Sequence, residues 1–227
     1  DISHALRTLG KDGFLQIFEK LISVGRINPN RIKIGRMPGC IVLIVNEGEY
    51  FKQVFGHFGD AAGLHVRSNL PERTMLPAAL EGRIIILNGD NERLPDNASH
   101  EYTHVIMEKY LELFEKEQYP HGYTTNEAQQ LFLDMRNELS AYAAGGDYCL
   151  NVNSLVPFGT PAKKRLENIP DATEREAIKL GWRRASKSIQ RAQKQKIPSA
   201  VLLPIFLTSQ TFDMMADRLE QTVLCAA

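Results

Sequence analysis

The sequence His-Glu-Tyr-Thr-His at residues 100–104 places the strongest constraint on how this chain can fold. Residues four apart lie on the same face of an α-helix, so His100 and His104 can offer their ring nitrogens to one metal ion. That geometry requires an unbroken helix. Apolar residues at helical spacing predict such a helix over residues 98–117, with Asn97 or Ser99 as its N-terminal cap.

Two histidines at this spacing are suited to zinc, which takes about four ligands and keeps one position open for water in catalytic sites. Glu101 is too close in sequence to His100 to share the same ion easily. It can instead act as general base towards a water molecule at the metal. We therefore expect Zn²⁺ at His100 and His104, with Glu101 as the catalytic residue. The alternative is an exposed helix face carrying two solvated histidines.

Zinc needs a third protein ligand, and His121, Glu127 and Glu138 are the downstream candidates. Glu138 lies among apolar positions of a second predicted helix. A carboxylate there is costly unless it is paired or binds a metal, so we expect Glu138 to be the ligand. Its alternative role is an ion pair with Arg136 or with another basic residue of the surface. His121 lies in a Pro-Gly turn and Glu127 occupies a capping-box position, and both stay open as ligands.

Four residues are candidates for supporting roles. Asp134 precedes Glu138 by one helical turn and can orient a ligand histidine, although a solvated aspartate fits the sequence equally well. Hydrolysis of a carbonyl also needs a hydrogen-bond donor for the oxyanion. Tyr142, Tyr123 and His121 are the candidates for that donor, and the spacing does not choose among them.

The order of predicted elements indicates an α+β protein. Strands are predicted at 31–37, 40–45, 64–67 and 83–87, and helices at 12–25, 50–58, 98–117, 124–146, 172–195 and 199–224. We expect a single catalytic domain over residues 1–227. It would consist of a small mixed sheet lobe over 1–92 and a helical lobe over 93–227 that carries the zinc site.

The composition excludes several classes of function. The formal net charge is zero, so no overall field attracts nucleic acid. Three widely separated cysteines indicate neither a disulfide framework nor a cysteine metal site. No apolar run is long enough to span a bilayer, and we expect a soluble protein, either cytoplasmic or secreted, including delivery as an effector. The basic helix at 183–196 is a candidate contact for a protein or an anionic surface, unless its charges are simply solvated.

The motif at residues 100–104, followed by Asn137-Glu138 on a separate helix, resembles the zinc metallopeptidases of the gluzincin type. The resemblance covers residues 83–146, and its specific part is five residues long. It implies a zinc endopeptidase in which His100, His104 and Glu138 bind the ion. The acid that often follows the glutamate by four residues in that group is replaced here by Tyr142. The third histidine of metzincins is also absent.

In that group a strand at the edge of the sheet, just before the active-site helix, binds the substrate backbone. The resemblance implies this role for Ile86, Leu87 and Asn88, whereas an internal core strand is the alternative. The expected partner is a peptide or protein substrate. Two other hypotheses remain: a zinc hydrolase of a non-protein amide or cell-wall peptide, and a non-enzymatic helical interaction module that uses the basic face at 183–196.

Overall fold

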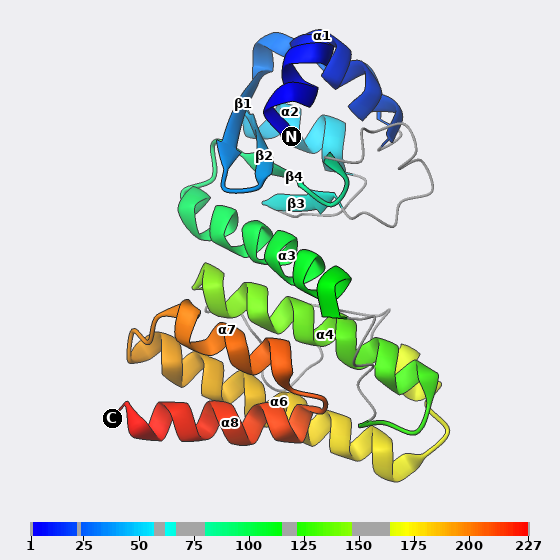
Figure 1. The fold of residues 1–227 in the computed structure, drawn as a ribbon, viewed down its shortest axis with the longest axis vertical. Coiled ribbons are helices and arrows are strands. Elements are labelled where there is room, and N and C mark those ends of the chain that lie inside the picture. The colour runs from blue at the N-terminus through cyan, green and yellow to red at the C-terminus, as the bar shows by residue number, and fades with distance from the viewer. Residues whose placement is uncertain are drawn as a thin grey trace. The chain divides into compact units, whose positions relative to one another are not determined.

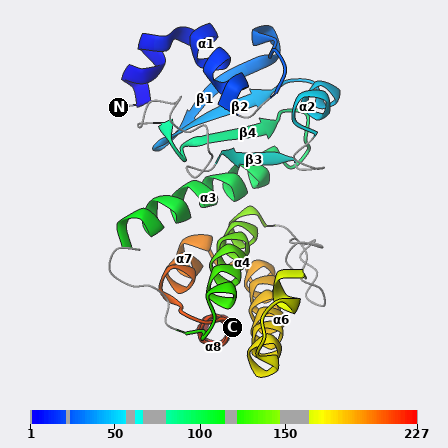
Figure 2. The same ribbon diagram turned by 90° about the vertical axis from the view of Figure 1, so that its right-hand side faces the viewer.

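The computed structural model describes residues 2–21, 24–56, 62–66, 80–114, 122–146 and 164–226. The chain divides into two compact units, Asp1–Lys109 and Tyr110–Ala227, named here the sheet unit and the helical unit. The division falls inside helix α3 (Leu94–Phe114), whereas the sequence places a lobe boundary near residue 92. The predicted α+β class is confirmed, because the sheet unit holds four strands and the described part of the helical unit holds only helices (Figures 1 and 2).

The sheet contains β1 (Ile32–Met37), β2 (Cys40–Val45), β3 (Gly63–Val66) and β4 (Ile84–Asn88), all of which the sequence predicts within a residue or two. Their order in space is β1-β2-β4-β3. The β1–β2 pair is an antiparallel hairpin, β2 and β4 are parallel, and β3 is antiparallel to β4. Strand β4 is therefore internal, and among the described strands β3 lies at one edge of the sheet.

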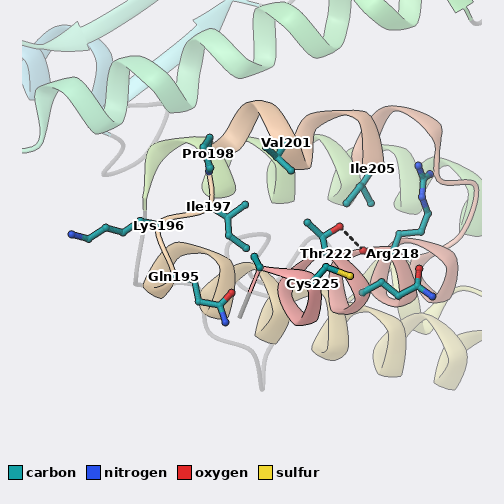
Figure 3. Close-up of a pocket in the computed structure, with 11 residues that line it drawn as sticks. Gln195, Lys196, Ile197, Pro198, Val201, Ile205, Arg218, Thr222 and Cys225 are labelled. Carbon is teal, nitrogen blue, oxygen red and sulfur yellow. Dashed lines mark hydrogen bonds between the residues drawn. The ribbon is translucent and has the colours of Figure 1, made fainter.

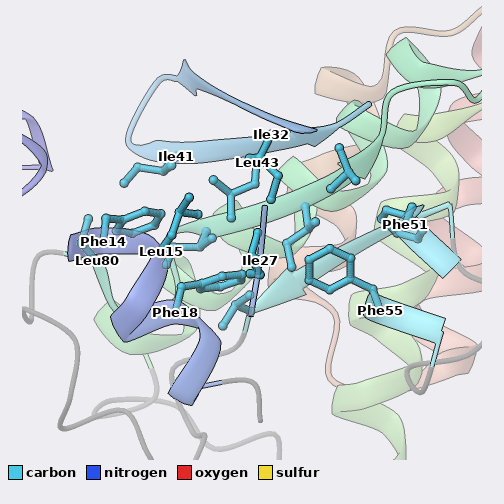
Figure 4. Close-up of a cluster of buried hydrophobic side chains, with 14 of the residues drawn as sticks. Phe14, Leu15, Phe18, Ile27, Ile32, Ile41, Leu43, Phe51, Phe55 and Leu80 are labelled. Carbon is cyan, nitrogen blue, oxygen red and sulfur yellow. The ribbon is translucent and has the colours of Figure 1, made fainter. Parts of the chain in front are cut away.

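One face of the sheet packs against α1 (Ile2–Leu21) and α2 (Gly48–Phe55). Side chains that alternate along β2 and β4 meet a cluster of phenylalanines from these two helices (Figure 4). The core residues on this face include Phe14, Phe18, Ile41, Leu43, Phe51, Phe55, Ile84 and Ile86. The opposite alternation of β2 and β4 is also apolar, so the strands are buried on both faces, as their continuous hydrophobic runs predict.

The other face of the sheet packs against α3. Val42, Ile85 and Leu87 contact Val105 and Tyr102 in a second apolar cluster. Burial of this cluster holds the helix that carries residues 100–104 on the sheet. The helix with the histidine pair is thus part of the sheet unit's core.

Helix α3 begins earlier than predicted. Asn91 Oδ1 accepts a hydrogen bond from Arg93 N at 2.8 Å, and the helix starts at the next residue. The prediction of Asn97 or Ser99 as the cap is wrong, because both lie inside the helix, where Ser99 Oγ donates to Pro95 O. Pro95 lies in the first turn, where a missing N–H group costs no intrahelical hydrogen bond.

The helical unit contains α4 (Asn126–Gly145), α6 (Ala172–Lys194), α7 (Ser199–Thr208) and α8 (Phe212–Cys225). The cap of α4 is Thr125, whose Oγ1 accepts from Ala128 N at 3.2 Å. The capping box predicted at 124–127 does not form, because the cap is Thr125 and the residue three positions later is Ala128, which has no carboxylate. Glu174 of α6 provides the carboxylate in place of Glu127, since its Oε1 accepts from Thr124 N at 2.7 Å.

The helix predicted at 199–224 is two helices. Helix α7 ends at Thr208, and Thr211 Oγ1 caps α8 by accepting from Met214 N at 3.2 Å. Thr211 favours the start of a new helix over continuation of α7, because its side chain accepts a hydrogen bond from an N–H group in the first turn of α8. Among the described helices, none is both long and apolar enough to cross a membrane.

The predicted basic face of α6 is partly neutralised. Arg184 Nη2 lies 2.6 Å from Asp217 Oδ1 and 2.8 Å from Glu220 Oε2 on α8. These pairs link α6 to α8 rather than leaving Arg184 for a partner. Arg183, Lys187 and other bases of the segment 183–196 remain exposed.

Tyr123 is an anchor of the helical core. Its hydroxyl oxygen accepts a hydrogen bond from Phe212 N at 2.9 Å, and its ring lies 5.6 Å from that of Phe132. Burial raises the pKa of Tyr123 well above its usual range, so its hydroxyl stays neutral. The bond ties the start of α8 to the segment before α4.

We expect Tyr123→Phe to destabilise the helical unit by about 1–3 kcal/mol, because it leaves the buried N–H of Phe212 without its acceptor. Urea unfolding followed by circular dichroism measures the loss. Tyr102→Phe is the control, since the bond from Tyr102 Oη to Pro38 O is exposed and water can replace it. Equal losses in the two variants would contradict the assigned role of Tyr123.

Candidate metal centre

The two histidines of residues 100–104 converge on one point. Their Nε2 atoms are 3.3 Å apart, and the rings meet at 83° with centroids 4.9 Å apart. Two nitrogens bound to one tetrahedral zinc at about 2.0–2.1 Å would lie about 3.3–3.4 Å from each other. Helix α3 therefore holds the pair at the separation that a shared ion needs. The same distance also allows a direct N–H···N hydrogen bond, so metal content has to be measured.

Glu138 of α4 joins the two histidines in the candidate centre. One ligand atom from each of His100, His104 and Glu138 lies within 4.8 Å of the other two. In the described part of the chain, this is the cluster of histidine, cysteine and acidic residues that can hold an ion. Two imidazoles and one carboxylate are donors that fit a divalent transition metal, although they do not identify it.

The backbone around Glu138 explains its position. The residue lies well inside α4, between the buried Met135 and Leu139, and is itself half-buried. His104 is buried and His100 is half-buried. The donor set is thus neither fully exposed nor sealed from solvent.

Glu127, one of the other two predicted ligands, is not in the cluster. It is exposed in the first turn of α4, about 17 Å from Glu138 along the helix axis. His121 lies outside the described residues, and its role as a ligand stays a prediction.

The predicted supporting residues have other contacts. Asp134 Oδ2 pairs with Arg165 Nη1 at 2.5 Å, which gives this carboxylate a basic partner. Tyr123 is the core anchor described above. Tyr142, one turn beyond Glu138, is half-buried, and its carbonyl oxygen accepts from Gln193 Nε2 at 2.9 Å. The role of an oxyanion donor stays a prediction for Tyr142.

Glu101 is buried, with 7% of its surface exposed, and lies directly against the edge strand β3. A Cβ atom added to Gly63 would stand 2.9 Å from Glu101 Cγ and 3.1 Å from Glu101 Oε1. These distances are shorter than ordinary van der Waals contact, so only glycine at position 63 leaves room for the carboxylate.

His65 of β3 supports the second histidine of the pair. Its ring lies nearly parallel to that of His104, with centroids 6.0 Å apart. His65 Nε2 is 3.0 Å from Gly82 O and 3.3 Å from Glu108 Oε2. Glu108 is one turn beyond His104 on α3, so Glu108 and the carbonyl of Gly82 together hold the His65 ring beside His104.

His65, Gly63 and Glu108 are not among the site residues predicted from the sequence. One usable signal was Glu108, because residues 100, 104 and 108 repeat every four positions and share a helix face. The strand pairing that brings His65 and Gly63 to this face involves residues distant in the sequence. No local sequence pattern indicates this pairing.

The prediction that Ile86, Leu87 and Asn88 form an edge strand is wrong. These residues belong to β4, which pairs with β2 on one side and with β3 on the other. The chain passes through β3 before it enters β4, and β3 adds outside β4. The edge beside Glu101 is consequently β3.

The cysteines of the described residues do not join the cluster. Cys40 is buried in the core between the sheet and α3, and burial raises the pKa of its thiol. Cys225 is exposed at the end of α8.

No known protein family, no curated protein and no solved structure matches the chain. The fold and the site define an α+β protein with a candidate metal centre of the His-Glu-x-x-His type.

We expect the purified protein to contain about one metal ion per chain, and His104→Ala and Glu138→Ala to lose most of it. Elemental analysis after dialysis measures the content. His4→Ala and Glu127→Ala are matched controls, since both residues are exposed and outside the cluster. Full metal content in Glu138→Ala would exclude that residue as the third ligand.

Proposed function

We propose that the protein is a zinc-dependent metalloendopeptidase. The observation that carries the proposal is the convergence of His100 Nε2 and His104 Nε2 at 3.3 Å with the Glu138 carboxylate in the same cluster. Two histidines and one glutamate form the donor set of catalytic zinc sites that keep a fourth position open. The three residues would hold the ion.

Glu101 is the proposed general base. Zinc bound at this centre would supply Lewis acidity for the carbonyl and for a water molecule. The Glu101 carboxylate takes a proton from the attacking water and passes it to the amine nitrogen as the peptide bond breaks. Its burial and its contact with Gly63 support this role, because they restrict the carboxylate to few positions.

The edge strand β3 is the proposed binding site for the substrate backbone. Its outer edge has no neighbour in the described sheet, and an extended peptide can pair there through main-chain hydrogen bonds. Gly63 places this strand against Glu101. A peptide added to β3 would therefore run beside the base. This contact favours a peptide substrate over a compact non-protein amide.

The non-enzymatic alternative has less support. An interaction module based on residues 183–196 does not explain why two histidines and a glutamate form a cluster on α3 and α4. The pairing of Arg184 with α8 also removes one charge from the basic face. Measurement of metal content separates this alternative from the two hydrolase hypotheses.

We expect Glu101→Gln to keep its metal and to lose peptide cleavage by about 10²–10⁴-fold, the usual contribution of a general base. A fluorogenic peptide library with the zinc-loaded protein gives the rate. Glu92→Gln is the matched control, because Glu92 is an exposed carboxylate just before α3. Undiminished cleavage by Glu101→Gln would refute the assignment of the base.

Gly63→Ala is expected to lower kcat while metal content stays near one ion per chain, since the added methyl group would crowd Glu101 and Leu87, neither of which is a proposed metal ligand. We expect the loss to be smaller than that in Glu101→Gln. Gly35→Ala on β1 is the control, because a Cβ there would meet only ordinary contacts at 3.8 Å and beyond. The same kcat in both glycine variants would count against the role of this contact.

A further inference from the structure

A second surface feature lies wholly in the helical unit. An open groove of about 730 Å³ runs between α7, α8 and the loop after α6 (Figure 3). Its lining residues are Gln195, Lys196, Ile197, Pro198, Val201, Ile205, Arg218, Gln221, Thr222, Cys225 and Ala226. The metal ligands are not among them, so the groove needs a separate explanation.

The floor of the groove is apolar and is built from helix faces. Ile197, Val201 and Ile205 follow one another at intervals of four residues along α7 and the segment before it. Thr222 and Cys225 contribute from α8. Val201 is 50% exposed, although it lies in a helix that is otherwise strongly apolar. Val201 and Ile205 lie about 6 Å apart along the axis of α7, and Ile197 extends the floor beyond the start of that helix.

The rim of the groove is positively charged. Lys196 and Arg218 are the charged residues that line it, and none of the described lining residues is acidic. Figure 3 draws these two residues at opposite ends of the lining set. Arg218 Nη1 donates to Thr208 Oγ1, a neutral hydroxyl, and no acidic partner for Arg218 or Lys196 occurs among the described residues. The groove thus carries uncompensated positive charge in a chain of zero net charge.

The start of α7 adds to this preference for acidic groups. Pro198, which lines the groove, is the N-cap residue and makes no side-chain cap. The first N–H groups of a helix without a side-chain cap favour nearby carboxylates. This end of the groove combines the positive end of α7 with Lys196.

We infer that the groove between α7 and α8 binds an acidic amphipathic helix of a partner protein. Apolar side chains four residues apart would enter the floor, and carboxylates near the two ends of the helix would pair with Lys196 and Arg218. The apolar floor favours a protein over a nucleic acid, since a phosphate backbone would bury no apolar surface there. The inference is independent of the proposed peptidase activity.

The test uses the full chain carrying Glu101→Gln, so that the probe is not cleaved. The probe is a fluorescent helical peptide of about three turns, with leucines four residues apart and glutamates at both ends. A second peptide replaces the glutamates by lysines. Fluorescence anisotropy should show saturable binding of the acidic peptide and binding at least about tenfold weaker for the basic one. Equal binding of both peptides, or none, would overturn the inference.

Matched variants locate the binding site. Val201→Glu should raise the Kd of the acidic peptide at least about tenfold, whereas Leu180→Glu, on exposed α6 surface outside the groove, should leave it unchanged. Lys196→Glu and Lys187→Glu form the corresponding pair for charge. Equal effects within either pair would refute the site. A single-stranded oligonucleotide that competes with the peptide and loses affinity in Lys196→Glu would favour a nucleic-acid partner and overturn the inference.

Chemical modification of the Cys225 thiol measures occupancy of the groove without any substitution in the protein. Cys225 lines the groove and is exposed, so iodoacetamide should modify it in the free protein. Saturating acidic peptide should slow that modification several-fold, as followed by peptide mapping with mass spectrometry. Unchanged labelling of Cys225 at saturation would place the peptide elsewhere and would overturn the inference.

Discussion

The packing of α3 against the sheet is the contact on which the candidate centre depends. Buried Val105 and partly buried Tyr102 pack against Val42, Ile85 and Leu87, and this apolar contact fixes the rotation of the helix about its axis. With the rotation fixed, His104 meets His65 and Glu101 meets Gly63. Apolar burial thus sets the direction of the polar groups, which could not hold that direction by their own hydrogen bonds in water.

Much of the fold could be predicted from the sequence, because the signals are local. The continuous apolar run of β2 indicates a strand buried on both faces, and Gly146 in the left-handed conformation ends α4 as expected. The histidine pair and Glu138 follow from helical spacing and from the cost of a half-buried carboxylate. The order of the strands in the sheet could not be predicted. The sequence of β4 is equally compatible with an edge and an interior position, and only the pairing with β3 decides.

The two units use charge in different ways. In the helical unit, Arg184 is surrounded by acids of α8, and that network helps to hold α6 and α8 together while leaving the groove beside α7 with its positive rim. In the sheet unit, the carboxylates of Glu101 and Glu108 lie close to glycines, whose missing side chains make the space. Two local environments therefore differ in charge although the formal net charge of the chain is zero: basic residues line the groove, and carboxylates lie beside the glycines of the sheet unit.

The two edges of the sheet differ in their protection against aggregation. Strand β1 has exposed Lys33 and Arg36, and charged side chains on an edge discourage pairing with strands of other molecules. Strand β3 is only four residues long, and its histidine points into the contact with α3 rather than outward. A short edge gives too few main-chain hydrogen bonds to seed a stable intermolecular sheet. For the proposed pairing of a peptide substrate with β3, the same shortness would keep each bound chain easy to release.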